Sequence, residues 1–174
     1  MRPHYLLDMD GVVCNFPMGT IIAHKRQESH EDINQWNIHE LFGMPEKEFW
    51  EPLKGVSFWE NLEPYPWAVE FYSKLKEMGD VTICTSPNAD EECIIGKYRW
   101  AKRVLGAKVK DFMVGGKKYL MAKSGILIDD YIENVNKFRG AGGTAILFKQ
   151  PWNSGHISYD YNQILQLLST GKCD

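Results

Sequence analysis

The stretch HYLLDMDGVVCNF, residues 4–16, places two aspartates directly after a short apolar run. Its first part, HYLLDMD over residues 4–10, has the pattern of a buried strand. Asp8 and Asp10 lie two residues apart, and like charges that close repel each other. The stretch therefore has two interpretations. It is either a strand that ends in a solvated turn, or a site where a cation holds the two carboxylates together.

The bulk composition is that of one globular domain with an ordinary charge. The chain has 174 residues, is 44% hydrophobic and carries a net charge of -3. This charge gives no reason to expect a long nucleic acid or a membrane as partner, and no run approaches the ~18 apolar residues of a membrane span. The four cysteines form no CxxC pair, which favours reduced thiols and a cytoplasmic location. The oligomeric state stays open, a homodimer included.

Apolar segments like the first one recur along the chain and alternate with helical patterns. Further strands are predicted at residues 81–86, 111–116, 125–130 and 144–148. Helices are predicted at residues 66–79, 91–106, 131–138 and 159–169. Continuous apolar strands separated by helices predict an α/β fold, a doubly wound, Rossmann-like parallel sheet.

Residues 15–65 break this alternation. They contain three segments that we predict to form short helices, at residues 20–28, 33–43 and 45–53. We expect a small helical cap, inserted after the first strand and placed over the carboxyl ends of the strands, where open α/β sheets bind ligands. Residues 1–14 and 66–174 are then predicted to form the α/β core.

Polar side chains recur where four of the predicted strands end. They are Asp8 and Asp10, then Thr85 and Ser86, then Lys117 and Lys118, then Asp129 and Asp130. In a parallel sheet these ends share one edge, so carboxylates can meet there to bind Mg²⁺, with hydroxyls and a lysine facing a phosphate. Each pair has a simpler explanation; Asp130, for example, could cap the following helix. Their recurrence in this order favours a site.

The same motifs resemble the haloacid dehalogenase-like phosphohydrolases, and more closely the 5'(3')-deoxyribonucleotidases. The resemblance rests on DMDGVVCNF, FWENLEP, ICTSP, KYRW and LIDD and covers nearly the whole chain, cap included. It implies a Mg²⁺-dependent phosphatase that removes the phosphate of a (deoxy)nucleoside monophosphate through an aspartyl-phosphate. Its substrate would be a small molecule.

The resemblance also implies catalytic roles for the aspartates. Asp8 matches the family nucleophile, and Asp10 matches the general acid that then acts as base. Mg²⁺ would be bound by a carboxylate oxygen of Asp8, the backbone carbonyl of Asp10 and the carboxylate of Asp130. Asp129 would orient the family lysine and a water on the metal.

Phosphate-binding positions are implied at Met9, Thr85, Ser86, Lys97 and Lys118, with Thr85 and Lys118 also catalytic. Lys118 fits the family lysine better than Lys117, because Leu120 and Met121 then take the two apolar places that follow it. For Lys97, a single lysine on a charged helix, the alternative is an exposed side chain.

Aromatic side chains of the cap fall where the family lines its nucleoside pocket. They are Phe16, Phe49, Trp50 and Phe58. The alternative is that such rings form the cap's own core, which we favour for Trp59. Three other functions stay open: the same chemistry on a sugar phosphate, the same chemistry on a polynucleotide end, and a non-catalytic nucleotide-binding module. The small cap argues for a small substrate, and the presence of both Asp8 and Asp10 argues for catalysis.

Overall fold

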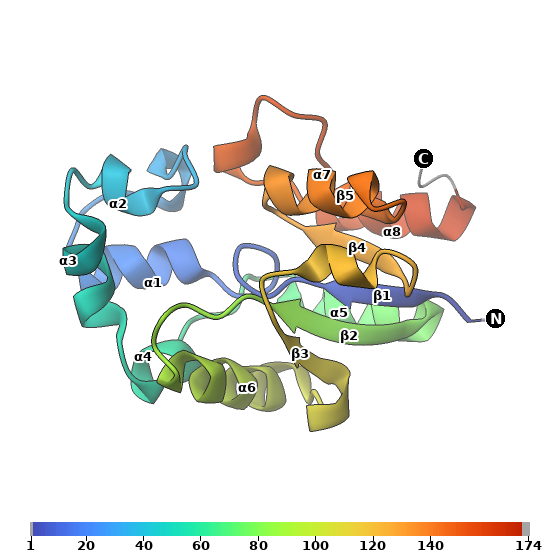
Figure 1. The fold of residues 1–174 in the computed structure, drawn as a ribbon, viewed down its shortest axis with the longest axis horizontal. Coiled ribbons are helices and arrows are strands. Elements are labelled where there is room, and N and C mark those ends of the chain that lie inside the picture. Colours follow the sequence, from blue (N-terminus) through green and yellow to red (C-terminus); the bar gives the residue numbers. More distant parts are fainter. Residues whose placement is uncertain (1, 172–174) are drawn as a thin grey trace.

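The computed structural model describes residues 2–171 and contains a five-stranded parallel sheet in the order β3-β2-β1-β4-β5 (Figure 1). The strands are β1 (His4–Leu7), β2 (Asp80–Thr85), β3 (Phe112–Val114), β4 (Ile126–Asp129) and β5 (Thr144–Leu147). Leu7 of the central strand β1 is in register with Ile83 on one side and Ile128 on the other. The prediction of a doubly wound, Rossmann-like parallel sheet is confirmed.

Four helices follow the strands of the core at the predicted places. They are α5 (Ala68–Met78), α6 (Glu92–Leu105), α7 (Ile132–Gly140) and α8 (Tyr161–Thr170). α6 ends at Gly106, whose φ of 66° is the left-handed conformation that favours glycine after a helix. α8 begins at Asp160, whose carboxylate accepts a hydrogen bond from the backbone N–H of Gln163. Local sequence signals therefore set these boundaries.

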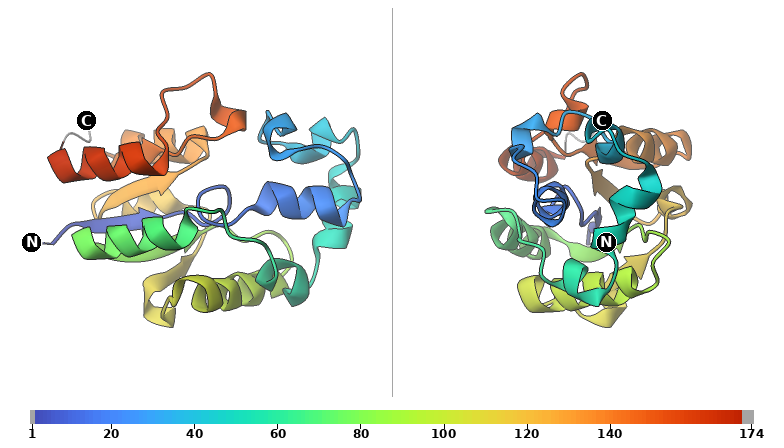
Figure 2. Two further views of the ribbon diagram at one scale, coloured as in Figure 1. Left: turned by 180° about the vertical axis from the view of Figure 1, so that it is seen from behind. Right: turned by 90° about the vertical axis from the view of Figure 1, so that its left-hand side faces the viewer.

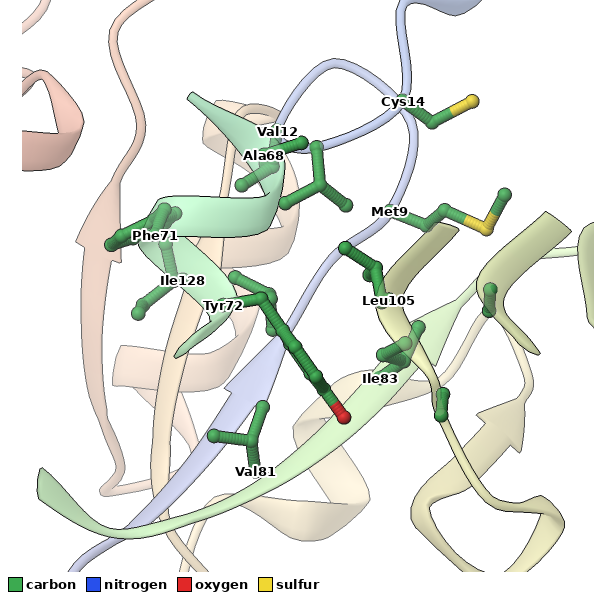
Figure 3. Packing of buried hydrophobic residues seen from close by; sticks show 14 of the residues in the cluster. Met9, Val12, Cys14, Ala68, Phe71, Tyr72, Val81, Ile83, Leu105 and Ile128 are labelled. Atoms are coloured by element: carbon green, nitrogen blue, oxygen red, sulfur yellow. The ribbon is translucent and has the colours of Figure 1, made fainter. Parts of the chain in front are cut away.

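Successive residues of the strands pack on opposite faces of the sheet. Tyr5 and Leu7 belong to a large buried cluster that also takes in side chains from α5, α6 and α8. Figure 3 shows part of this cluster, with Phe71 of α5 and Leu105 of α6 labelled. Leu6 points the other way, into a second cluster with Val135 and Phe138 of α7. Both faces are apolar because each is covered by helices, which explains the continuous apolar runs of the sequence.

The first strand is shorter than predicted and ends at Leu7, not at residue 10. The Asp8 N–H still bonds the carbonyl of Ile128 at 2.9 Å. The carbonyl of Met9 then accepts the backbone N–H groups of Val12, Val13 and Cys14, at 3.3, 3.0 and 2.8 Å. Because of this turn, Asp10 does not continue the direction of β1 beyond Asp8.

Four short helices between β1 and α5 lie beyond the carboxyl ends of the strands (Figures 1 and 2). They are α1 (Phe16–Ala23), α2 (Ile38–Leu41), α3 (Glu46–Trp50) and α4 (Val56–Glu60). We define the cap as residues 15–65, because the chain enters and leaves it side by side: the Asn15 N–H bonds Glu63 O at 2.9 Å and the Tyr65 N–H bonds Val13 O at 3.0 Å. The sequence did not predict α4 as a separate helix, since five residues are too few to show a helical period.

Within residues 2–171 the structure has no helix long and apolar enough to cross a membrane. Cys14, Cys84 and Cys93 are free and buried. Cys173 lies outside the described residues.

Candidate active site

Three carboxylates meet at the carboxyl edge of the sheet. Oxygen atoms of Asp8, Asp129 and Asp130 lie within 4.8 Å of one another, and all three residues are buried. Asp8 follows β1, and the other two lie at the end of β4, which is the neighbouring strand. The convergence that the strand ends predicted is therefore present. The carboxylate of Asp10 is not in this group.

Lys118 lies between two of these carboxylates. Its Nζ is 2.6 Å from Asp8 Oδ1 and 2.7 Å from Asp129 Oδ2, and the residue is 3% exposed. Burial by itself lowers the pKa of Lys118, but the charges of Asp129 and Asp8 outweigh it and raise the pKa above its usual value. Lys117 is exposed. Of the two adjacent lysines, Lys118 is the one that contacts the aspartates.

When ionised, the three carboxylates carry more negative charge than Lys118 neutralises. Burial, with Asp129 and Asp10 nearby, raises the pKa of Asp8 to about 7 although Lys118 lowers it. The pKa of Asp130 is also raised, first by burial and then by the charges of Asp8 and Asp129. Asp130 Oδ1 is buried without a hydrogen-bond partner, while Oδ2 accepts from Trp152 Nε1 at 2.9 Å. A buried set of carboxylate oxygens with an unpaired acceptor fits a hard divalent cation such as Mg²⁺.

Asp10 is held by a different lysine. Lys97 Nζ lies 2.5 Å from Asp10 Oδ2, and it also donates to Thr85 Oγ1 at 3.1 Å and to the backbone carbonyl of Ser86 at 2.7 Å. Burial lowers the pKa of Lys97, but the charge of Asp10 outweighs it and raises the pKa. Lys97 is 2% exposed, so the alternative of an exposed side chain is wrong. The ammonium also lies 4.8 Å from the centre of the Trp59 ring.

Gly11 is required by the close packing of the loop that carries the two aspartates. Its φ is +74°, and a Cβ at this position would lie 2.1 Å from Asp130 Oδ2. The Gly11 carbonyl accepts a hydrogen bond from the side-chain amide of Gln150. The loop is thereby held against the residues that follow β4 and β5.

A cavity of about 320 Å³ lies between the cap and part of this charged group; Lys118, Asp129 and Asp130 are not among its lining residues. Asp8, Asp10, Ser86 and Lys97 line it from the core. Aromatic rings line it from the cap, among them Phe16, Phe49, Trp50 and Trp59. The ring of Phe16 stacks on Trp50 at 6.1 Å and 27° and on Trp59 at 5.4 Å and 3°. The cavity thus has one charged and one aromatic side.

Some predicted site residues lie elsewhere than expected. The side chain of Met9 is buried in the core cluster (Figure 3), so a phosphate could meet only its backbone. Phe58 does not line the cavity and packs edge-on behind Phe16 at 6.3 Å and 85°. Trp59, which we favoured as a purely internal ring, is buried and also lines the cavity. Asp130 does not cap α7, because its Oδ2 accepts from Trp152 instead.

The sequence reasoning missed the segment after β5. Trp152 lines the cavity, and the Asn153 amide donates to the backbone carbonyls of Asp130 at 2.8 Å and of Phe148 at 2.7 Å. The rule that located the other residues, polar groups at the end of a parallel strand, applies equally to residues 148–153. Extending it to the last predicted strand would have found them.

Comparisons with known proteins agree with this geometry. Residues 2–163 match the family described as "5' nucleotidase, deoxy (Pyrimidine), cytosolic type C protein". An inferred 5'(3')-deoxyribonucleotidase of Bordetella pertussis is 32% identical over 136 residues, which cover 72% of each chain. The cytosolic-type 5'(3')-deoxyribonucleotidase of Homo sapiens is 28% identical over 138 residues, covering 72% of this chain and 69% of the human one.

The solved structures show the same fold. A haloacid dehalogenase-type hydrolase of family IA from Entamoeba histolytica superposes with a TM-score of 0.56, at 12% identity, over 97% of this chain and 100% of the other. At that identity the likeness concerns the fold alone, while the family match covers most of the sequence. The chain therefore belongs to the deoxyribonucleotide 5'-nucleotidase family of cytosolic type C and is a phosphoric monoester hydrolase.

Proposed function

We propose that this enzyme hydrolyses the phosphate monoester of a (deoxy)nucleoside monophosphate, with Mg²⁺, through an aspartyl-phosphate on Asp8. One observation carries the proposal: a single cavity is lined by Asp8, which belongs to the buried carboxylate group, by Asp10, and by the stacked rings of Phe16 and Trp50. The charged side suits a phosphate, and the rings suit the flat faces of a base.

The two steps of the reaction are divided between Asp8 and Asp10. A carboxylate oxygen of Asp8 attacks phosphorus, and the bond from phosphorus to the sugar oxygen breaks while Asp10, which must carry a proton at the start of this step, gives that proton to the sugar oxygen and becomes a carboxylate. Asp10 then takes a proton from a water that attacks the phosphorus, which frees inorganic phosphate and restores Asp8. Lys97, 2.5 Å from Asp10, holds the carboxylate in place for both transfers.

The phosphate oxygens would meet donors from three strand ends. The Thr85 and Ser86 hydroxyls, the Lys118 ammonium and the backbone of Met9 are the groups that we assign to this role. Lys118 keeps its proton because its raised pKa leaves it charged between Asp8 and Asp129. Fixed donors of this kind stabilise the charge that develops on the moving phosphoryl group.

The residues that would hold Mg²⁺ are Asp8, Asp130 and the backbone carbonyl of Asp10. When bound, the ion neutralises the paired carboxylates and the phosphate oxygens. Asp129 keeps Lys118 in position, at 2.7 Å, and would orient a water on the metal. The unpaired Oδ1 of Asp130 and the raised pKa of Asp8 support this assignment.

The names of the relatives favour a nucleotide over a sugar phosphate or a polynucleotide end as the substrate. Both named relatives are 5'(3')-deoxyribonucleotidases, and the human one is of cytosolic type, which supports a cytoplasmic location for this chain as well. The volume of about 320 Å³ lies at the small end of the ~300–1,000 Å³ range of ligand pockets, as expected for a single small ester.

The test is a panel of phosphate esters with released phosphate as the readout. The panel holds 5'- and 3'-(deoxy)nucleoside monophosphates, several sugar phosphates and a small aryl phosphate, all measured with Mg²⁺. We expect the highest kcat/KM for a nucleoside monophosphate. If a sugar phosphate is the better substrate, the enzyme is a small-ester phosphatase and the nucleotide assignment is overturned.

A further inference from the structure

A stacked ring pair joins the cap to the core beside the cavity. The rings of Trp36 and Tyr131 lie 3.9 Å apart between their centres, at an angle of 15°. Trp36 belongs to the coil between residues 33 and 37, just before α2, and Tyr131 comes directly after Asp130. The two residues are far apart in the sequence. We call this contact the Trp36–Tyr131 bridge.

The bridge is connected to the buried carboxylate of Asp129 on one side and to the cavity on the other. The backbone N–H of Tyr131 donates to Asp129 Oδ1 at 2.9 Å. Trp36 lines the cavity together with its neighbours Gln35 and Asn37, and Asn134 of α7 faces them from the core. Trp36 therefore forms part of the cavity wall on the side of α7, and Tyr131 supports it from the core.

The cap is held to the core much more strongly on the opposite side. There α4 packs extensively on α6, and Trp100 Nε1 of α6 donates to Leu62 O at 2.7 Å. Arg103 of α6 donates to Glu60 O at 2.6 Å. On the side of the bridge, by contrast, Trp36 remains 42% exposed. Opening of the cap would therefore take place at the bridge, with α4 and α6 as the fixed side.

We propose that the Trp36–Tyr131 bridge limits the size of the substrate: when closed, it confines the cavity to one small phosphate ester and keeps out the phosphorylated end of an oligonucleotide. This inference rests on the proposed function, since it assigns size selection to the same site. Both rings are needed, because Trp36 lines the cavity on this side and its ring is stacked on Tyr131 of the core.

The experiment compares two substrates that differ only in length. They are a deoxynucleoside 5'-monophosphate and the 5'-phosphorylated dinucleotide that begins with the same nucleoside. The measured quantity is the ratio of kcat/KM for the dinucleotide to kcat/KM for the mononucleotide. Wild type should strongly prefer the mononucleotide. Equal hydrolysis of both by wild type would overturn the proposal.

Removing either ring should relax this preference. A stacked pair contributes a factor of about 2 to 13 beyond its buried area, so we expect Trp36→Ala and Tyr131→Ala each to raise the ratio by a factor in this range. The double variant should raise it no further than the larger single effect, because both substitutions remove the same contact. Tyr131→Phe is the matched control. It keeps the ring, and the ratio should remain that of wild type.

Amide hydrogen exchange and far-UV spectra distinguish a failure of the bridge proposal from a variant that does not fold. Amide hydrogen exchange over residues 30–41 should become faster in both alanine variants and remain unchanged in Tyr131→Phe. Unchanged ratios and unchanged exchange in alanine variants with native far-UV spectra would overturn the bridge, while nucleotide hydrolysis would stand. If Tyr131→Ala does not fold, the result for Trp36→Ala decides whether the bridge limits substrate size, because Trp36 is partly exposed and its substitution should disturb the fold less.

The size limit can also be tested if nucleotides are not substrates. Phenyl phosphate and the bulkier naphthyl phosphate then replace the mononucleotide and the dinucleotide. A higher naphthyl-to-phenyl ratio in the alanine variants would support the bridge even though the nucleotide assignment had failed. An unchanged ratio would overturn the size limit set by the bridge.

Discussion

The cavity is lined on one side by the carboxyl edge of the sheet, with Asp8 and Asp10, and on the other by the rings of Phe16, Trp50 and Trp59, which we call the cap wall. Different interactions hold the side chains of these two regions in place. At the sheet edge, Lys118 and Lys97 contact Asp8, Asp129 and Asp10 at 2.5–2.7 Å. At the cap wall, the contacts are stacked rings such as Phe16 on Trp59, 5.4 Å apart. The first region positions atoms within a hydrogen-bond length, and the second offers a broad apolar surface. We infer that reaction chemistry and substrate choice are separate properties of the two regions.

The energies of the two kinds of contact differ as well. Breaking a buried ion pair by removing one partner costs about 3–5 kcal/mol, because a charge is left without compensation. A stacked ring pair contributes about 0.5–1.5 kcal/mol beyond its buried area. Substitutions at the sheet edge should therefore affect every substrate, and substitutions at the cap wall only those substrates that reach it.

The largest effect is expected for Asp8→Asn. An amide cannot form the acyl-phosphate, so phosphate release should fall by roughly 10⁴-fold or more for nucleotide and aryl phosphates alike. Released phosphate is measured alongside the far-UV spectrum, which should remain native because Lys118 keeps its contact with Asp129. Turnover above one per cent of wild type, in protein free of host phosphatase, would show that the nucleophile is another residue.

Removal of divalent cations should abolish activity on both substrates. The buried carboxylates of Asp8, Asp129 and Asp130 have Lys118 as their neutralising partner, so a cation is needed to balance them. Excess chelator should stop phosphate release, and Mg²⁺ should restore it. Ca²⁺ should restore it poorly, because its coordination shell is larger and looser.

The outcome that would contradict the metal assignment is full activity in chelator. A thermal melt supplies an independent readout, since Mg²⁺ that binds only the folded state raises the Tm. If Mg²⁺ raises the Tm of Asp130→Asn as much as that of wild type, the ion binds at another place.

Asp10→Asn should damage the nucleotide and aryl phosphate reactions together. Loss of a general acid and base lowers kcat by about 10²- to 10⁴-fold. The variant should also be less stable, because Lys97 is buried and loses its carboxylate partner. Chemical denaturation measures this loss. In the double variant Asp10→Asn/Lys97→Met stability should recover while activity does not, and recovery of both would assign Asp10 a purely structural role.

A smaller and more selective loss than for the aspartate variants is expected for Trp50→Ala. A base stacked on this ring gains roughly 1–3 kcal/mol, so kcat/KM for a nucleoside monophosphate should fall by about 5- to 150-fold. Hydrolysis of phenyl phosphate should stay within about twofold of wild type, because phenyl phosphate does not extend to the cap ring.

Phe58→Ala is the matched control on the same cap. Phe58 contacts Phe16 and Trp59 but does not line the cavity, so this variant should lose stability without a change in substrate preference. If Trp50→Ala and Phe16→Ala slow both substrates equally, the rings are cap core and the two regions are not functionally separate.

The sequence by itself determined the sheet, its helices and the edge at which the site lies. Apolar runs and helical periods indicate which side chains of a segment are buried, and they can be read from neighbouring residues of the sequence alone. Asp8, Asp129, Asp130 and the pair Lys117 and Lys118 could be located because parallel strands end at one edge, so residues at those ends meet whatever the details of packing. The resemblance to the deoxyribonucleotidases then selected Lys118 from the pair. The same rule, applied to β5, would have pointed to the segment 148–153, which contains Trp152.

Side-chain partners were decided by the tertiary structure alone. Asp10 pairs with Lys97 because the turn after Met9 and the packing of α6 bring the two together, and neither is visible in a local pattern. Trp59 lies in the cavity wall and Phe58 behind it, because the short helix α4 settles on α6 in one orientation. The Trp36–Tyr131 bridge likewise depends on how the cap rests on the core. Sequence periodicity reports whether a residue is buried, and only the packing of distant elements determines what it is buried against.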